Sequence, residues 1–356
     1  MANTEQTRVP TTESAMYQTM HRQPADLRRL LAAEGWAAAE EAAGRIAEAR
    51  RIYVVGIGTS YHAAQVGEWL LKAADRDARA VSSFDFAHYP EAFPIGPDDA
   101  VIVMAHSGVK RYSTQSLERS AAAGATRISV GSLTAEHTGS QQVLRTVERE
   151  KSAAFTASHL AAMTVLAQLA VALGASALRT QLEKLPDLVA DAVARQDQVT
   201  PVAHDAASKR IYAVGGGPNA ATATEAVIKV REAAQGWIDG LPIEQFLHGP
   251  IVAVNAGDVA VVVNAAGAAC AERVAEITRV LAAIGANVWL IGSPVGGVDS
   301  ARVFTLPELP EPLSPLLTVV PVQMLAYEMA VVRGIHPDLF RRDDPRYAAA
   351  YGLLKL

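Results

Sequence analysis

The sequence contains a single cysteine, Cys270, among 356 residues. One cysteine excludes a disulfide framework and a cysteine metal cluster, and it suits the reducing cytoplasm. Charged residues make up only 19% of the chain, and the net charge is −5. The chain therefore lacks the positive charge typical of proteins that bind nucleic acid or anionic membranes. We expect a cytoplasmic globular protein with a sizeable core that binds neither.

The N-terminal residues 1–14 lack the apolar core of a signal peptide, and we predict that they form a mobile leader. The most apolar run, residues 160–178, has the length of a membrane span. However, Thr164, Gln168 and Ser176 interrupt it, and alanine is its main component. This pattern favours a buried helix of a globular protein over a membrane-spanning one.

Short apolar runs alternate with segments of helical length, which predicts parallel βαβ units. The predicted strands are 51–55, 101–104 and 126–130, and the predicted helices between and after them are 61–74 and 112–123. The sequence around them then repeats at a shift of 159 residues. The first repeated motif is Arg51-Ile52-Tyr53 with Val55-Gly56 and Gly58, which returns as Arg210-Ile211-Tyr212 with Val214-Gly215 and Gly217. The repeat continues with Asp99 and Gly108, which return as Asp258 and Gly267.

This internal duplication predicts an α/β fold of two doubly wound halves, each a parallel sheet flanked by helices. We assign 1–14 to the leader, 15–44 to N-terminal helices, 45–190 to the first half, 200–333 to the second half, and 334–356 to a C-terminal tail near the active site.

The stretch 210–250 is predicted to form a strand, a glycine turn, a long helix and a polar loop. Glu225, Lys229 and Glu232 are spaced by four and three residues, so they share one face of the helix. Glu232 is a candidate general base that Lys229 positions, or simply a member of a surface ion pair. His248 follows in the loop, either as a second catalytic group or as a structural loop histidine.

The turn Gly58-Thr59-Ser60 lies between a predicted strand and a helix. Its glycine permits close approach, and the helix N-terminus and hydroxyls offer donors to a phosphate group. The alternative is that Thr59 and Ser60 only cap the helix. Tyr61 stands where the last glycine of a GxGxxG motif would be, so the turn gives little support to dinucleotide binding.

A second polar turn, His106-Ser107-Gly108, also follows a strand, and Lys110 and Arg111 add two cations. It is a second candidate anion site or a solvated basic turn. Ser152, before the long apolar run, is a third candidate hydroxyl donor or the cap of that helix. We expect the first two turns to share one phosphate group.

Five motifs in this order resemble the sugar isomerase (SIS) domain family, above all the isomerase half of glucosamine-6-phosphate synthase. The sequence GTSYHA at 58–63 resembles the CGTSYHA turn of that family, and AHSG at 105–108 resembles its SQSGET loop. AAFT at 153–156 resembles its STKAFT segment. Glu225, Lys229 and Glu232 match its EGALKLKE helix, and LHGP at 247–250 matches its LKHGP loop.

The resemblance implies two flavodoxin-like SIS subdomains, of which the first binds a phosphosugar. It also implies that the phosphate is faced by Thr59, Ser60, Ser107 and Ser152. By the same resemblance, Glu232 moves a proton between C1 and C2, and Lys229 supports Glu232. His248 assists ring opening from the partner chain of a homodimer with shared active sites. The candidate phosphate-binding set is Gly58, Thr59, Ser60, His106, Ser107, Lys110 and Ser152.

The chain departs from the family pattern at three places. Val109-Lys110 replaces the Glu-Thr of the phosphate loop, and Ala350 stands where the tail carries a lysine, with Lys355 five residues later. A glutaminase half with an N-terminal cysteine nucleophile is missing, so we do not expect this chain alone to hydrolyse glutamine.

We predict an enzyme without cofactor or metal that acts on a phosphorylated sugar or aminosugar, as an aldose–ketose isomerase or an aminosugar-phosphate deaminase. The alternatives are a deglycase of a phosphorylated sugar–amine adduct and a non-catalytic phosphosugar sensor.

Overall fold

The computed structural model describes residues 11–108 and 110–354. Most of the predicted leader, together with Val109 and Lys355, lies outside the described residues. Within the leader, Thr11–Glu13 form a 3₁₀ turn, and the hydroxyl of Ser14 accepts a hydrogen bond from Tyr17 N at the start of the first helix. Leader mobility stays a prediction.

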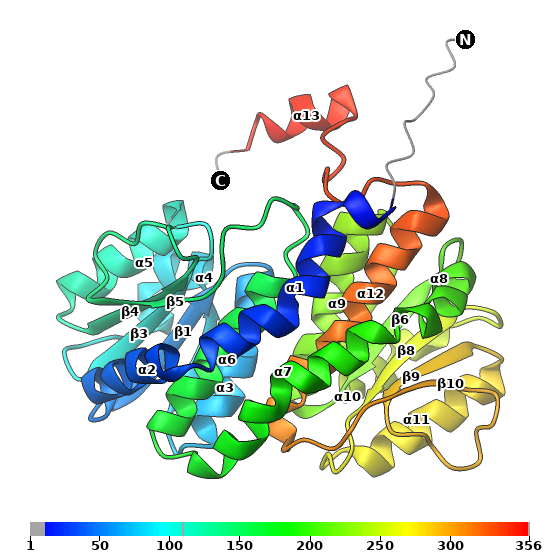
Figure 1. Cartoon of the computed structure of the whole chain (residues 1–356), viewed down its shortest axis with the longest axis horizontal. Helices are drawn as coiled ribbons and strands as arrows, with labels where there is room; N and C mark the ends of the chain where they lie inside the picture. The colour runs from blue at the N-terminus through cyan, green and yellow to red at the C-terminus, as the bar shows by residue number, and fades with distance from the viewer. Residues whose placement is uncertain (1–10, 109, 355–356) are drawn as a thin grey trace.

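Two five-stranded sheets, with strand orders β2-β1-β3-β4-β5 and β7-β6-β8-β9-β10, form the two halves of the molecule (Figure 1). Every neighbouring pair recorded in each sheet is parallel. The order is flavodoxin-like in both halves. The strands are β1 (Arg51–Gly56), β2 (Ala78–Ser82), β3 (Asp99–Met104), β4 (Thr126–Gly131), β5 (Gln142–Arg145), β6 (Ile211–Gly215), β7 (Ile238–Pro242), β8 (Val259–Asn264), β9 (Asn287–Gly292) and β10 (Arg302–Thr305).

The two halves repeat each other in contacts as well as in topology, which confirms the duplication. The buried Tyr53 hydroxyl donates to Pro94 O at 3.1 Å, and 159 residues later the Tyr212 hydroxyl donates to Ala253 O at 3.0 Å. Asp99 accepts a hydrogen bond from a backbone N–H three residues before it, and Asp258 does the same. These shared contacts explain why the same residues return.

The α-helices flank both sheets and also fill the space between the halves. They are α1 (Ala15–Leu30), α2 (Ala33–Ile46), α3 (Thr59–Lys72), α4 (Ser83–His88), α5 (Arg111–Ala122), α6 (Ala157–Ala172), α7 (Arg179–Ala194), α8 (Thr200–Ala206), α9 (Ala220–Ala234), α10 (Ile243–Leu247), α11 (Ala271–Ile284), α12 (Pro315–Arg333) and α13 (Pro345–Tyr351). Short 3₁₀ turns precede several of them, including η7 (Glu311–Leu313) before α12.

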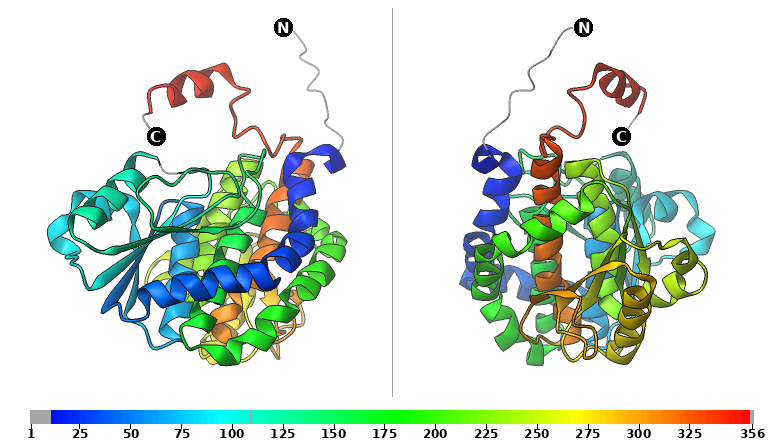
Figure 2. Two further views of the ribbon diagram at one scale, coloured as in Figure 1. Left: turned by 60° about the vertical axis from the view of Figure 1, so that its left-hand side comes forward. Right: turned by 90° about the vertical axis from the view of Figure 1, so that its right-hand side faces the viewer.

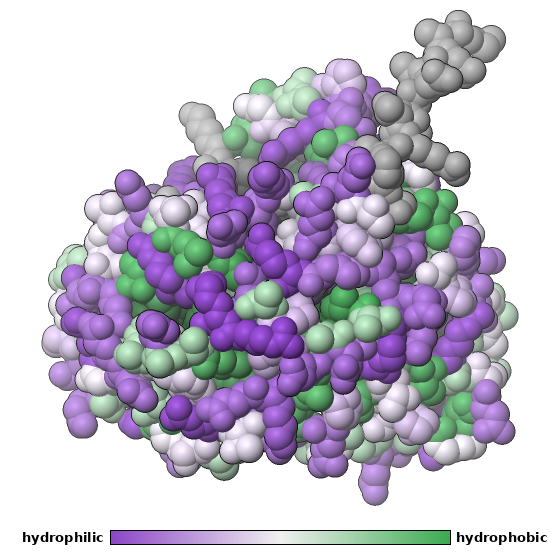
Figure 3. All heavy atoms as spheres, in the orientation of Figure 1, coloured by the Kyte–Doolittle hydropathy of each residue, from purple (hydrophilic) through white to green (hydrophobic). Residues whose placement is uncertain are grey.

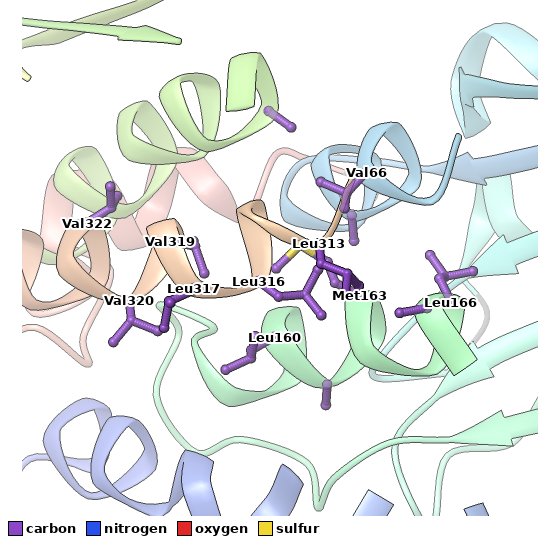
Figure 4. Packing of buried hydrophobic residues seen from close by; sticks show 14 of the residues in the cluster. Val66, Leu160, Met163, Leu166, Leu313, Leu316, Leu317, Val319, Val320 and Val322 are labelled. Atoms are coloured by element: carbon purple, nitrogen blue, oxygen red, sulfur yellow. The ribbon is translucent and has the colours of Figure 1, made fainter. Parts of the chain in front are cut away.

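The largest hydrophobic core joins the halves through helices α3, α6, α9 and α12. Figure 4 shows leucines and valines of η7 and α12 beside Leu160, Met163 and Leu166 of α6 and Val66 of α3. A Cβ added to Gly67 of α3 would lie only 2.7 Å from Leu166 Cδ1, so glycine allows α3 and α6 to approach closely. This packing fixes the position of one half relative to the other.

Residues 160–172 of the apolar run lie in α6, which is buried over nearly its whole length as predicted, but α6 ends at Ala172 and Ser176–Leu178 form a separate 3₁₀ turn. By length and composition, one helix among the described residues could cross a membrane, over Glu311–Arg333. Its most apolar window is 83% buried inside the protein, as is typical of a core helix. Figure 3 shows a mostly hydrophilic face on which hydrophobic residues form small separate areas.

The chain after α12 lies beside the start of α1. Both carboxylate oxygens of Asp338 accept backbone N–H groups, from Ala15 at 2.7 Å and from Met16 at 2.9 Å. The backbone of Ala153 also donates to Asp338 O at 3.4 Å. Beyond this anchor, α13 stands away from the body of the protein (Figure 2). The tail therefore leaves the fold next to the segment that carries Ser152.

The expected polar loop after the long helix was wrong, because residues 238–242 form β7 and residues 243–247 form the short helix α10. This strand pairs with β6 at the edge of the sheet, and only Ile238 in it is fully buried. A half-buried edge strand lacks the continuous apolar run that reveals a central strand. Three further strands that the sequence did not reveal, β2, β5 and β10, are also edge strands.

Candidate active site

A small, partly open cavity lies where the strands of the first sheet end and helices α3 and α6 begin. In open α/β sheets, ligands bind outside the carboxyl ends of the strands. The cavity is lined by Thr59, Ser60, Ala63, Met104, Ala105, His106, Val130, Gly131, Thr146, Phe155, Ser158, His159 and Ala162.

The tight turn before α3 positions the hydroxyls of Thr59 and Ser60. Gly58 has a φ of +59°, which favours glycine, and it occupies the N-cap position of α3. A Cβ added to Gly56 would lie 2.5 Å from the backbone of Ser60, so the strand end and the first helical turn lie in direct contact. The N-terminus of α3, the positive end of the helix dipole, thus lies at the cavity, although Ser60 N already donates to Ile57 O and Tyr61 N to Gly58 O.

The predicted phosphate-binding residues do not all lie at this cavity. Thr59, Ser60 and His106 line it, and Ser107 is the next residue of the same loop. Lys110 is exposed at the start of α5, outside the lining. Ser152 is buried and is not among the residues that line the cavity. Its hydroxyl oxygen accepts a hydrogen bond from Ala154 N at 3.2 Å.

A chain of polar contacts leads from the cavity into the second half of the molecule. Thr59 Oγ1 donates to Glu225 Oε1 at 3.0 Å, and His62 Nδ1 lies 2.6 Å from Glu225 Oε2. The carboxylate of Glu225 is fully buried. Burial alone would raise its pKa, but His159, Lys229 and His62 outweigh burial and hold the pKa below the ordinary value. Glu225 is therefore an anion that joins α3 to α9.

Lys229 extends this chain to the predicted base. Its ammonium group is buried, 3.5 Å from Glu225 and 2.7 Å from Glu232. The predicted shared face of α9 is thus observed. Burial raises the pKa of Glu232, the charges of Glu225 and Glu150 raise it further, and Lys229 opposes them. The Glu232 side chain keeps 21% of its surface exposed, but neither Glu232 nor Lys229 is among the residues that line the cavity.

Glu150, just before α6, is a third carboxylate near the same ammonium group. It accepts hydrogen bonds from Thr156 N, Ser158 N and the Thr156 hydroxyl. Burial raises its pKa, although these donors and the charge of Lys229 act in the opposite direction. Three carboxylates therefore surround one buried cation, which favours a proton on the least compensated of them.

His159 lines the cavity and is 4% exposed. Burial lowers the pKa of its imidazole to about 4, and the charge of Glu225 only partly offsets this. His248, by contrast, is 77% exposed, and its nearest charged group within its own chain is Glu244, at 3.5 Å. It lies neither in the cavity nor in the contacts of Glu232, so within one chain the two predicted catalytic residues are not brought together.

The second half has a corresponding small cavity, beside which polar side chains bind one another. This cavity is lined by Ala265, Ala266, Gly292, Leu306, Pro307, Leu309, Ser314, Leu317 and Thr318. Asn219 donates to Ser314 Oγ and accepts from Thr318 Oγ1, both at 2.7 Å. These hydroxyls are therefore already paired.

A carboxylate stands beside the loops that correspond to the phosphate-binding turns. Ala269 N, 159 residues after Lys110, donates to Glu311 Oε2 at 3.2 Å. A Cβ added to Gly217, 159 residues after Gly58, would lie 3.1 Å from Glu311 Oε1. The carboxylate of Glu311 therefore lies beside the two positions of the second half that correspond to Gly58 and Lys110.

Sequence reasoning missed His62, His159 and Glu150, and it placed Glu225 on the shared face without a role. Glu225 pairs with His62 from 163 residues away, a separation that no local pattern reveals. The three-residue spacing of Thr59 and His62 on the first turn of α3 was the one available signal. Among the described residues, no group of three or more His, Cys, Asp or Glu could hold a metal ion.

Residues 45–172 match the model of the SIS domain. The chain is 27% identical over 300 residues to glutamine–fructose-6-phosphate aminotransferase (isomerizing) from Pyrococcus horikoshii. That match covers 81% of this chain and 50% of the relative, so the chain spans about half the length of the curated relatives it matches.

Two solved structures share the fold. The C-terminal domain of glucosamine-fructose-6-phosphate aminotransferase from Francisella tularensis superposes with a TM-score of 0.82 at 16% identity, over 93% of this chain and 100% of that chain. Glucosamine-6-phosphate deaminase from Thermotoga maritima superposes with a TM-score of 0.73 at 17% identity, over 92% and 97%. Such low identity establishes the two-subdomain α/β fold alone.

Proposed function

We propose that this chain, which carries an SIS domain at residues 45–172 and resembles the isomerase half of glucosamine-6-phosphate synthase, is an enzyme acting on a phosphorylated sugar or aminosugar. The reaction is a proton transfer between C1 and C2. It gives aldose–ketose isomerisation, or deamination when C2 carries an amine. The names of the Pyrococcus and Thermotoga proteins, an isomerizing aminotransferase and a deaminase, support this class.

The phosphate group binds at the N-terminus of α3, against Thr59 and Ser60, with His106 and Ser107 on the opposite loop. Helix N-termini bind phosphate through free N–H groups and the helix dipole. Lys110, exposed near the loop, adds positive charge that attracts the ligand from solution. The single hydroxyl proton of Thr59 is donated to Glu225 Oε1, so Thr59 holds the turn against α9, and Ser60 is the hydroxyl that is left to donate to the phosphate group.

Glu232 is the base, and its environment is the observation that carries the proposal. A carboxylate that removes a proton next to a carbonyl works best when its pKa lies nearer neutrality. Burial and the neighbouring carboxylates raise the pKa of Glu232, while the 2.7 Å contact with Lys229 keeps an ionised form accessible. The proton leaves C2 or C1, resides on Glu232 while an enediol or enolamine exists, and returns to the other carbon.

Exchange of substrate hydrogens with solvent tests this assignment. A panel of hexose and aminohexose 6-phosphates, with a phosphorylated sugar–amine adduct, is incubated with the protein in D₂O and followed by NMR at C1 and C2. We expect exchange with at least one substrate, and a loss of about 10²- to 10⁴-fold in Glu232→Gln with phosphosugar binding retained. Glu183→Gln, at the exposed i,i+4 pair with Arg179, is the matched control.

The other outcomes of this panel separate the alternatives. Release of the amine from the adduct alone identifies a deglycase. Binding without exchange in any sugar identifies a sensor, a role with which the exposed Ala350 on α13 is compatible. Full exchange activity in Glu232→Gln contradicts the assignment of the base.

We also propose that two chains share their active sites, with His248 of one chain promoting ring opening in the other. Its 77% exposure and its distance from the cavity of its own chain support this arrangement. Mixing Glu232→Gln and His248→Gln chains tests it. Each mixed dimer regains one intact site, so random mixing restores about a quarter of the wild-type activity. No recovery after verified subunit exchange contradicts shared sites.

A further inference from the structure

One histidine that lines the cavity has no hydrogen-bond partner among the described residues. Neither Nδ1 nor Nε2 of His106 has a partner among the described residues, although both atoms are buried. The ring is held edge-on to Phe155, with centroids 5.3 Å apart and planes at 69°. A buried polar group without a hydrogen-bond partner lowers the stability of the protein. An unpaired imidazole at a ligand cavity therefore suggests that an atom of the ligand forms the missing hydrogen bond.

The side chains that line this cavity carry no fixed charge. None of the residues that line it is a lysine, arginine, aspartate or glutamate. Only His106 and His159 in the lining can become cations. Since a sugar phosphate brings up to two negative charges at neutral pH, the helix N-terminus and hydroxyls alone leave the anion without a counter-charge.

We propose that His106 takes up a proton when the phosphate group of the substrate enters the cavity, so that phosphosugar binding is linked to protonation of the site. The inference rests on the proposed function. The proton comes from solvent and is bound by a ring nitrogen, and no covalent bond of the ligand changes. Binding strength then depends on pH through this residue.

The charges that face His106 keep it neutral in the free protein. Burial lowers the pKa of its imidazole to about 4, and the charges of Arg149 and His137 lower it further. Arg149 lies on the segment between β5 and α6, and His137 on the loop between β4 and β5. Neither of these neighbours is an anion, so the entering phosphate is the group that supplies the opposing charge. An opposite charge in contact raises the pKa of an imidazole by roughly 1–3 units, and a dianion raises it further.

His159 is the less suitable proton acceptor, although it lines the same cavity. Its ring already interacts with the backbone of Thr59, and the charges of Lys229 and His62 disfavour its protonation. His137 does not line the cavity, and both of its ring nitrogens are also unpaired among the described residues. These two residues therefore serve as matched comparisons for His106.

Calorimetry with sulfate and with glucosamine 6-phosphate tests the inference. Sulfate stays a dianion over the accessible pH range, so any proton taken up belongs to the protein. Titrations near neutral pH in buffers of different ionisation enthalpy give the number of protons. We expect uptake of up to about one proton for each bound anion, and an affinity that falls by up to about tenfold for each unit of rising pH.

The variants assign the proton. In His106→Gln we expect weaker binding without proton uptake, whereas His159→Gln and His137→Gln retain uptake. Uptake that persists in His106→Gln overturns the assignment. Wild-type binding of glucosamine 6-phosphate or sulfate without uptake overturns the proton linkage but leaves the proposed function intact. If no phosphosugar in the panel binds the wild-type chain, the proposed function and this inference both fail.

Discussion

The residue that controls the charge balance of the site is Lys229. It is fully buried, yet the charges of Glu232, Glu225 and Glu150 raise its pKa against the effect of burial. One buried cation cannot neutralise three carboxylates. Glu225 has Thr59 and His62 as additional partners, and Glu150 has donors from Thr156 and Ser158. The partly exposed Glu232 is therefore the carboxylate whose protonation responds most readily to pH and ligand.

The first prediction at this scale concerns the acid side of the pH profile. Glu232 must be deprotonated to act as a base, and burial raises its pKa. Activity should therefore rise with pH through a midpoint above the ordinary glutamate value of about 4.3. Lys229→Met removes the attraction that favours the carboxylate, so the midpoint should move to higher pH as activity falls. The measurement is kcat/KM against pH.

The matched control for this profile is Lys72→Met, which breaks an exposed i,i+4 pair with Glu68. That variant should leave the midpoint of the wild type unchanged. A midpoint that moves to lower pH in Lys229→Met would show that Lys229 does not stabilise the ionised base.

A second prediction at this scale concerns stability. Glu225 is a buried charge with three partners, so Glu225→Leu leaves His62, Thr59 and Lys229 without their shared acceptor. We expect the free energy of unfolding to fall by about 3–5 kcal/mol. Glu183→Leu, at the exposed pair with Arg179, should cost less than about 1 kcal/mol. Urea denaturation measures both, and equal losses would show that the buried network is not stabilising.

At the scale of elements, the sequence revealed what is fully buried and missed what is half buried. Every residue of β3 and β8 is buried, and these strands appear as continuous apolar runs. The edge strand β2 alternates buried, exposed and intermediate positions over five residues, a pattern too short to distinguish from a loop. The α9 face was predictable because helical spacing is local. Its partners on α3 and α6 were not, since tertiary packing alone brings them there.

The duplicated glycine turns allow a matched prediction about one element. A Cβ added to Gly56 would lie 2.5 Å from the backbone of Ser60, and one added to Gly215 would lie 2.1 Å from Asn219 O. Each alanine substitution should therefore displace the first turn of the following helix and cost about 1–3 kcal/mol. Only Gly56→Ala should also weaken phosphosugar binding, because its turn lines the first cavity.

Thermal unfolding and phosphosugar titration of the two variants check this pair. Equal loss of affinity in Gly215→Ala would indicate that the second cavity also binds the ligand. Unchanged affinity in Gly56→Ala would place the phosphate group away from the α3 turn.

At the scale of the whole molecule, the sequence correctly predicted two α/β halves related by duplication, and the structure adds how they differ. The asymmetry in hydroxyls was visible in the sequence, since Pro218-Asn219 stands where the first half has Thr59-Ser60. The reason for it was not, because Glu311 lies outside the repeated motifs. Its carboxylate reaches the Gly217 turn only once η7 has folded beside it.

The last prediction follows from this asymmetry. If Glu311 supplies the second half with its own anion, the wild-type chain should bind one phosphosugar per chain, at the first cavity. Glu311→Ala removes the fixed charge and leaves Ala269 N without its acceptor. Sulfate should then raise the unfolding midpoint of Glu311→Ala more than that of the wild type, because the vacated turn gains affinity for anions.

Glu276→Ala, at an exposed pair with Arg273, is the control, and it should respond to sulfate as the wild type does. An identical response in all three chains would mean that Glu311 does not substitute for a ligand. The two halves would then differ by the loss of hydroxyls alone.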